Sequence, residues 1–166
     1  ALLDPELTLK LPLGITISSG LDTISHALES IWNHNSNIIS ITIATSSLSL
    51  AIPALNNLLD SLDNLEARSQ MMQASYLSGL AISKTRTALA HSISYPITNH
   101  FSVAHGIACS FTLPEVLRFN ALEDDGRLHK LAVNLGYLGI EELASILEKL
   151  LHKCNVLAVL KNNIKD

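Results

Sequence analysis

Apolar residues recur at helical spacing soon after a leading segment, 1–14, that contains two prolines. The first such set would share one helix face and comprises Leu21, Ile24, Leu28 and Ile31. Ser18 or Ser19 would cap this helix at about Gly20. The helix should end near 33–35, where poor helix formers follow one another. The pattern therefore predicts an early amphipathic helix.

The most apolar stretch, 38–55, gives an ambiguous pattern. Its beginning, 39–43, alternates apolar and polar residues and is rich in β-branched side chains, as in a strand. The apolar run continues for about a dozen more residues, which is too long for one strand. We therefore predict a buried helix, capped by Ser36 and kinked or restarted near Pro53. Because Ser and Thr interrupt the run, we do not expect it to span a bilayer.

A third helix should begin after Asp63 or Asn64. Its predicted inward stripe comprises Leu65, Met72, Tyr76, Gly79 and Ser83. Gly79 on this stripe indicates either a close approach of two helices or a merely tolerated glycine.

The second half of the chain also has helical patterns. We predict a short helix over 87–95 that stops at Pro96, followed by a loop over 96–104. A helix over 105–120 should kink or restart at Pro114. Two amphipathic helices follow, over 123–134 and 140–153, and the second has acidic residues at its start and lysines at its end. The predicted fold is all-α, a bundle of about six or seven helices.

The composition and charge of the chain limit the kinds of molecule that it is expected to bind. The chain has 166 residues, 48% of them hydrophobic and only 4% aromatic, so it should fold around an aliphatic core. A net charge of −4 without a basic run argues against nucleic acid or an anionic membrane surface as partner. The two cysteines, Cys109 and Cys154, form no disulfide framework, and 1–13 has no secretory signal pattern. We expect a cytoplasmic protein.

Two stretches, 20–33 and 90–120, carry the candidate chemistry. Asp22 and His26 are four residues apart, so on a helix they share one face. His91 and His105 lie on either side of the segment containing Pro96. One carboxylate and three imidazoles would suit a divalent metal ion with an open coordination position. The alternative interpretation is structural: Asp22 and His26 form a surface pair, and the other histidines make hydrogen bonds in the core.

Other polar residues receive simpler interpretations. His34, His129 and His152 should be solvated, His100 stays open, and Cys109 should be a small core residue. Glu29 either supports an imidazole or is solvated. Gly106 directly follows His105, so a ligand could approach the backbone closely there.

The same stretches resemble the C-terminal, metal-binding helical domain of the iron-containing (group III) alcohol dehydrogenases, a dehydroquinate synthase-like helical domain. The first part of the resemblance is carried by Asp4, Pro5, Leu7, Thr8, Pro12, Gly20, Asp22, His26, Ala27 and Glu29. The second part is carried by His91, Pro96, His105, Gly106, Ala108, Leu113, Pro114, Val116 and Asn120. The sequences of 25–33 and 94–114 also show a weaker resemblance to family members that reduce phosphonate-bearing aldehydes.

The resemblance implies a function. Asp22, His26, His91 and His105 would be ligands to Fe²⁺, or alternatively Zn²⁺, and the ion would polarise the oxygen of a small alcohol or aldehyde. NAD or NADP would exchange a hydride with that substrate and would be bound mainly by a dinucleotide domain that is missing here. Tyr95 stands where many members have a further histidine near the nicotinamide and would be a catalytic residue, whose phenol could hydrogen-bond the substrate or relay a proton. A phenol holds its proton more tightly than an imidazole does, so it would be the poorer proton shuttle.

It also implies a domain organisation. Residues 15–166 would be an all-α catalytic domain that is incomplete at its C-terminus, the fragment alone would be inactive, and the enzyme would be a homodimer. Two other interpretations of the chain's function stay open. One is a non-catalytic helical oligomerisation or interaction domain derived from the same fold. The other is a metal-dependent hydrolase, for which neither a nucleophile elbow nor a second metal cluster is visible.

Overall fold

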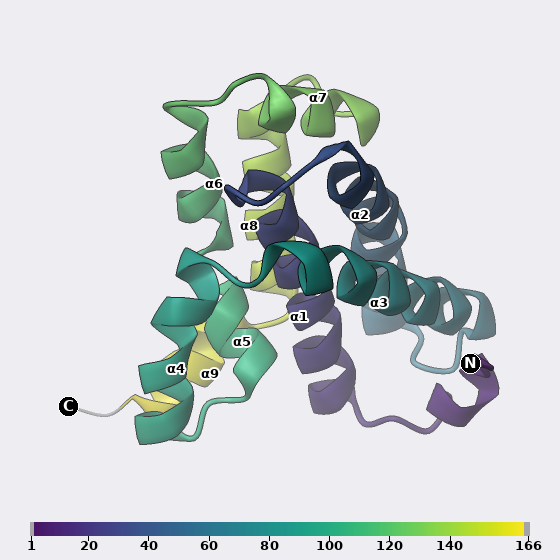
Figure 1. The fold of residues 1–166 in the computed structure, drawn as a ribbon. Helices are drawn as coiled ribbons and strands as arrows, with labels where there is room; N and C mark the ends of the chain where they lie inside the picture. The colour runs from purple at the N-terminus through teal and green to yellow at the C-terminus, as the bar shows by residue number, and fades with distance from the viewer. Residues whose placement is uncertain (1, 165–166) are drawn as a thin grey trace.

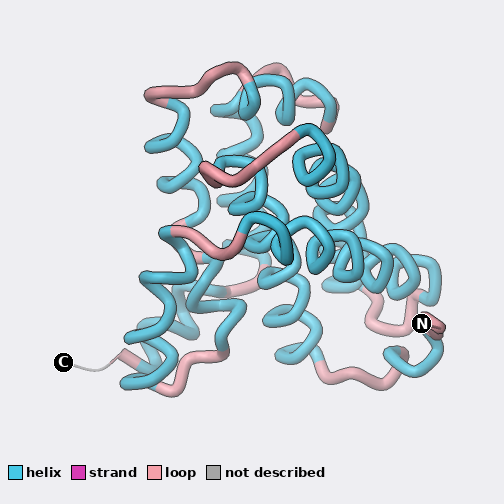
Figure 2. Tube along the Cα trace, in the orientation of Figure 1, coloured by secondary structure: helices cyan, strands magenta, loops and turns pink. Residues whose placement is uncertain are grey.

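The protein is described by a computed structural model that covers residues 2–164. This part of the chain contains a short 3₁₀ helix and nine α-helices and no strand, which confirms the all-α class and exceeds the six or seven helices predicted. The elements are η1 (Pro5–Thr8), α1 (Leu13–Trp32), α2 (Ile38–Asp60), α3 (Leu65–Thr85), α4 (Leu89–Phe101), α5 (His105–Ser110), α6 (Leu113–Ala121), α7 (Arg127–Asn134), α8 (Ile140–Lys153) and α9 (Val156–Asn163). Short loops join them (Figure 2).

Helix α1 organises the fold. It packs against α2 and α3 on one side and against α5 and α4 on another, and α7 covers its C-terminal end (Figure 1). Its apolar face is fully buried and includes Leu21, Ile24, Leu28 and Ile31, as predicted. Because its second half is enclosed on most sides, a polar residue there must find its partners inside the protein. This requirement shapes the site described below.

Helices α2 and α3 form the neighbouring layer. Helix α2 confirms a helix in place of a strand, and it runs through Pro53 without the predicted restart. By length and composition alone it could cross a membrane, contrary to the expectation from its Ser and Thr residues. Its apolar residues nevertheless have protein neighbours, since Ala44, Leu48 and Leu55 are fully buried in the core formed with α1 and α3. Packing therefore accounts for its apolar character.

Three predicted details of the first helices are wrong. Helix α1 begins at Leu13 rather than about Gly20, so Ser18 and Ser19 lie inside it. Asn37, not Ser36, caps α2, and its side chain accepts hydrogen bonds from the backbone N–H groups of Ile39 and Ser40. A hydroxyl cap and an internal hydroxyl that bonds back to the preceding turn look alike in sequence, and Ser19 does the latter.

The inward face of α3 also differs from the prediction. Asn64 caps the helix, but Tyr76, Gly79 and Ser83 are exposed. The buried face carries Ala67, Arg68, Ala74, Ser78, Ala81 and Thr85. Small residues let α3 lie close to α1 and α2, whereas a Cβ added at Gly79 would meet nothing within 4 Å.

Helix α4 extends further than predicted. It continues through Pro96 to Phe101, so 96–101 is helix and not loop, and Ser102 ends it in the left-handed conformation with φ 53°. Pro96 lies on the exposed face, as does Ser92, whose carbonyl loses its helical partner. Water can therefore satisfy that carbonyl, which makes the proline tolerable.

The remaining helices follow the predicted order. The helix over 105–120 divides into α5 and α6, with Pro114 in the first turn of α6, as expected for a restart. Helix α7 begins only at Arg127, because Asp124 accepts hydrogen bonds from the backbone of its first turn. Helix α8 has the predicted bounds, and α9 was not predicted.

Candidate metal centre

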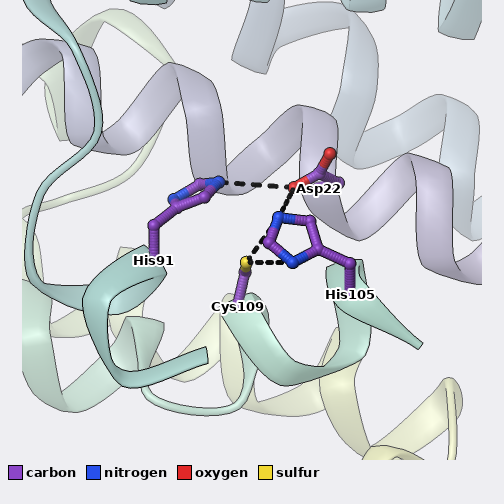
Figure 3. A group of neighbouring side chains, drawn as sticks. All are labelled: Asp22, His91, His105 and Cys109. Carbon is purple, nitrogen blue, oxygen red and sulfur yellow. Dashed lines mark hydrogen bonds and ion pairs between the residues drawn. The ribbon is translucent and has the colours of Figure 1, made fainter. Parts of the chain in front are cut away.

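Three helices each present a pair of residues at i, i+4 spacing. Helix α1 presents Asp22 and His26, α4 presents His91 and Tyr95, and α5 presents His105 and Cys109; four of these six appear in Figure 3. At this spacing the two side chains of a pair share one helix face. The predicted ligands are therefore brought together by the crossing of α4 and α5 over α1.

Gly106 permits the contact between α5 and α1. A Cβ at this position would lie 1.8 Å from the backbone oxygen of Ser18. The N–H of Gly106 instead donates to the Ser18 hydroxyl at 3.3 Å. The close approach predicted at Gly106 is thus filled by the α1 backbone and not by a ligand, and it sets His105 beside Asp22.

Glu29 fixes α4 from the next turns of α1. Its carboxylate is fully buried and accepts hydrogen bonds from the N–H groups of Ala88 (2.6 Å), Ala90 (2.7 Å) and His91 (3.2 Å). The N-cap residue of α4 is Ala88, which has no side-chain oxygen to offer. Glu29 therefore caps the N-terminus of α4 from a distant part of the chain. The helix dipole favours a negative charge at this end of the helix.

The same carboxylate orients an imidazole. Glu29 Oε2 lies 2.8 Å from His91 Nδ1, so Nδ1 carries a proton and donates it. The other ring nitrogen, Nε2, then faces Asp22. Burial alone would raise the pKa of Glu29, but the hydrogen bonds from His91 and from the amide of Ala88 outweigh burial and lower this pKa. Glu29 is accordingly a carboxylate at neutral pH.

The carboxylate of Asp22 is the meeting point of the three imidazoles. Its Oδ1 lies 3.5 Å from His91 Nε2 and 3.8 Å from Nε2 of both His26 and His105. His91 is 2% exposed, whereas His105 retains 40% of its side-chain surface, so the group opens to one side. Within the described residues, neither Asp22 Oδ1 nor His91 Nε2 has a hydrogen-bond partner. A buried polar atom without a hydrogen-bond partner is costly, and a cation bound by both atoms would remove this cost.

The electrostatics of the group suit a cation. Burial opposes the negative charge of Asp22, but His91, His26 and His105 lower its pKa. Burial lowers the pKa of His26 despite the nearby Asp22, which keeps that imidazole neutral. Burial would also lower the pKa of His91, yet Asp22, Cys109 and Glu29 raise it to about 12. The neighbouring carboxylates therefore favour a positive charge beside His91.

Cys109 belongs to this group, although the sequence suggested only a small core residue. It is fully buried as expected, but its Sγ lies 3.4 Å from His105 Nε2 (Figure 3). One ligand atom from each of Asp22, His91, His105 and Cys109 lies within 4.8 Å of the others. The i, i+4 spacing from His105 was the sequence signal that could have identified it.

The other histidines stay apart from the group. His34, His129 and His152 are exposed, as predicted. His100, which stayed open, is exposed in the last turn of α4, where its ring meets Phe101 edge-on. Tyr95 is half-exposed, and its ring lies parallel to that of His105 with 6.3 Å between centroids. It therefore flanks the open side of the group.

Comparison with known proteins decides the family. The profile described as "Fe-containing alcohol dehydrogenase family, C-terminal" matches residues 16–165. The chain belongs to this family. Among curated members it is 32% identical over 136 residues to the NAD-dependent methanol dehydrogenase of Bacillus methanolicus, covering 82% of this chain and 36% of that protein. It is 37% identical over 120 residues to the phosphonoacetaldehyde reductase of Streptomyces viridochromogenes, covering 72% and 30%.

Solved structures of the family share the fold. The sulfoacetaldehyde reductase of Bifidobacterium kashiwanohense, solved in complex with NAD⁺, superimposes with a TM-score of 0.88 at 28% identity and covers 97% of this chain and 48% of that one. The iron-containing alcohol dehydrogenase of Thermococcus thioreducens gives a TM-score of 0.87 at 25% identity, covering 99% and 43%. The chain thus spans about a third of the two curated relatives and less than half of the solved ones.

Proposed function

We propose that this chain forms the metal-binding half of an NAD- or NADP-dependent enzyme that interconverts a small alcohol and its aldehyde. The observation that carries the proposal is the convergence of three imidazoles on Asp22. Neither Asp22 Oδ1 nor the buried His91 Nε2 has a hydrogen-bond partner between residues 2 and 164. Family membership supports it, because the similar proteins named above are alcohol dehydrogenases and aldehyde reductases.

In this proposal Asp22, His26, His91 and His105 hold Fe²⁺, with Zn²⁺ as the alternative ion. The ion would act as a Lewis acid on the substrate oxygen. Glu29 keeps the Nδ1 proton of His91 in place, so that Nε2 presents its lone pair toward the ion. Support of this kind typically changes metal affinity by about 10–100-fold.

Tyr95 is a catalytic residue in the proposal. It flanks the open side of the group, and its exposed phenol can donate a hydrogen bond to a substrate oxygen that approaches from there. The nicotinamide would be held mainly by a dinucleotide-binding domain outside this chain and would exchange a hydride with the substrate.

Metal analysis of the purified chain tests the site. The protein is loaded anaerobically with Fe²⁺, or with Zn²⁺, dialysed, and assayed for bound metal by elemental analysis. We expect one equivalent in the wild type and in His152→Ala, since His152 is exposed and remote from the group. Asp22→Ala and His105→Ala should lose most of it. Equal metal content in all four proteins would remove the site.

The same samples address the non-catalytic alternative. Sedimentation with and without metal measures the predicted dimer. A dimer that forms regardless of metal, in a chain that binds none, would favour an oligomerisation domain over an enzyme half.

A further inference from the structure

We propose that this centre can bind metal through either of two ligand sets. A thiophilic ion such as Zn²⁺ takes the Cys109 sulfur as its fourth ligand in place of His26. The inference rests on the proposed metal site and concerns the choice of ion. Asp22, His91 and His105 would be common to both ligand sets. The fourth donor would be His26 for the harder Fe²⁺ and Cys109 for the softer ion.

Two of the distances between donor atoms in the centre match those of a tetrahedron that includes the sulfur. Ligand bonds of about 2.0–2.3 Å in tetrahedral arrangement place neighbouring donor atoms about 3.3–3.6 Å apart. His105 Nε2 lies 3.4 Å from Cys109 Sγ, and Asp22 Oδ1 lies 3.5 Å from His91 Nε2. Asp22 Oδ1 and His105 Nε2 are 3.8 Å apart, and all four donors lie within 4.8 Å of one another. The sulfur also lies 3.8 Å from His105 Nδ1, so the His105 ring must turn to close the tetrahedron.

The orientation of His26 is less favourable for binding beside His91. The two rings are stacked, with centroids 4.8 Å apart and only 11° between their planes. An imidazole nitrogen binds a metal through a lone pair in the plane of its ring. Lone pairs in two parallel, separated planes reach one ion only through bonds bent out of the ring planes, so His26 would turn to join His91. The rings of His91 and His105 are inclined by 60° and have no such conflict.

A buried thiol beside an unpartnered imidazole points to the same use. Cys109 is fully buried, and His91, only 2% exposed, has an Nε2 that faces the group without a hydrogen-bond partner among the described residues. On binding, the Cys109 thiol would release its proton to solvent and bind the ion as thiolate. Thiolate ligands favour Zn²⁺ over the hard divalent ions, so the presence of Cys109 would shift the centre toward zinc.

Cobalt provides the test, since Co²⁺ replaces Zn²⁺ and a cobalt–thiolate bond gives a charge-transfer absorption band in the near ultraviolet. Co²⁺ is titrated into the wild type, Cys109→Ser, Cys109→Ala, His26→Ala and the matched control Cys154→Ser, whose cysteine is buried at the end of α8. We expect the band in the wild type, His26→Ala and Cys154→Ser, and its loss in both Cys109 variants. Zn²⁺ affinity should fall about 100-fold in Cys109→Ser, since loss of a mere supporting partner already costs about 10–100-fold.

The possible failures are distinguishable. Stoichiometric Co²⁺ binding by the wild type without a thiolate band would overturn the role of Cys109 and leave the metal site intact. Absence of Co²⁺, Fe²⁺ and Zn²⁺ binding in every protein would overturn both proposals. If the Cys109 variants do not fold, Cys154→Ser decides, because Cys109 is then the only cysteine of the chain. A thiolate band in this variant would assign the bond to Cys109, and bound Co²⁺ without the band would refute its ligation.

Discussion

Replacing Glu29 by glutamine should destabilise the domain through α4. The carboxylate accepts four hydrogen bonds, three from backbone N–H groups at the start of α4 and one from His91 Nδ1. A glutamine of the same shape keeps one acceptor oxygen but turns an NH₂ group toward N–H donors. At least one donor is then left buried and unsatisfied, and the charge at the helix N-terminus is lost.

The expected loss in the free energy of unfolding is about 3–5 kcal/mol. Hydrogen bonds to charged groups contribute about 1.5–3 kcal/mol each, an unsatisfied buried donor costs about 1–3 kcal/mol, and breaking a buried ion pair costs about 3–5 kcal/mol. In a domain of this size about 1 kcal/mol corresponds to about 2–4 °C, so Tm should fall by about 6–20 °C. Urea denaturation of the metal-free protein gives the free energy and a thermal scan gives Tm.

The control is Glu123→Gln, which alters an exposed glutamate between α6 and α7 and should change stability by less than about 0.5 kcal/mol. A loss in Glu29→Gln below about 1 kcal/mol would refute the role of Glu29 as the cap of α4.

The pH dependence provides a second check. Because the pKa of Glu29 is lowered on folding, its contribution is fully present above the unfolded value near 4.5 and is lost as pH falls below it. The difference in stability between wild type and Glu29→Gln should therefore shrink below about pH 4.5. A constant difference down to pH 3 would contradict this reasoning.

Three further predictions follow from other parts of the structure. Gly106→Ala would place a methyl group 1.8 Å from the Ser18 carbonyl oxygen and should lower the free energy of unfolding by about 1–3 kcal/mol or more. Gly79→Ala, on an open helix face, should raise it by up to about 1 kcal/mol. Urea denaturation of both variants measures these free energies. Arg118→Gln removes a surface cation that pairs with three glutamates and should cost about 1 kcal/mol at low salt and less at high salt, which chemical denaturation at two ionic strengths would reveal. Burial raises the pKa of Cys154 to about 11, so its alkylation at pH 8 should be slow until urea unfolds the chain, and fast reaction in the native protein would contradict its burial.

Local patterns determined much of this protein. The apolar periodicity of α1 and α8 reports which face of a helix is buried, and the structure buries those faces. The i, i+4 pairing of Asp22 with His26 needs only helical geometry, and the spacing of the motifs through Asn120 was enough to indicate the family, which the profile match confirms. These features depend on neighbours within one or two turns, and a sequence displays such neighbours directly.

Tertiary structure decided what lies between distant segments. The cap of α4 comes from Glu29, which is 61 residues before Ala90, so Ala88 gave no capping signal of its own. Pro96 stays within a helix because solvent reaches the carbonyl of Ser92. Tertiary structure sets this exposure, and local helix propensity does not report it. The place of Cys109 beside Asp22 and His91 depends on α5 crossing α1 at Gly106. Which surfaces meet is set by the packing of the whole core, and a linear pattern records each face without its partner.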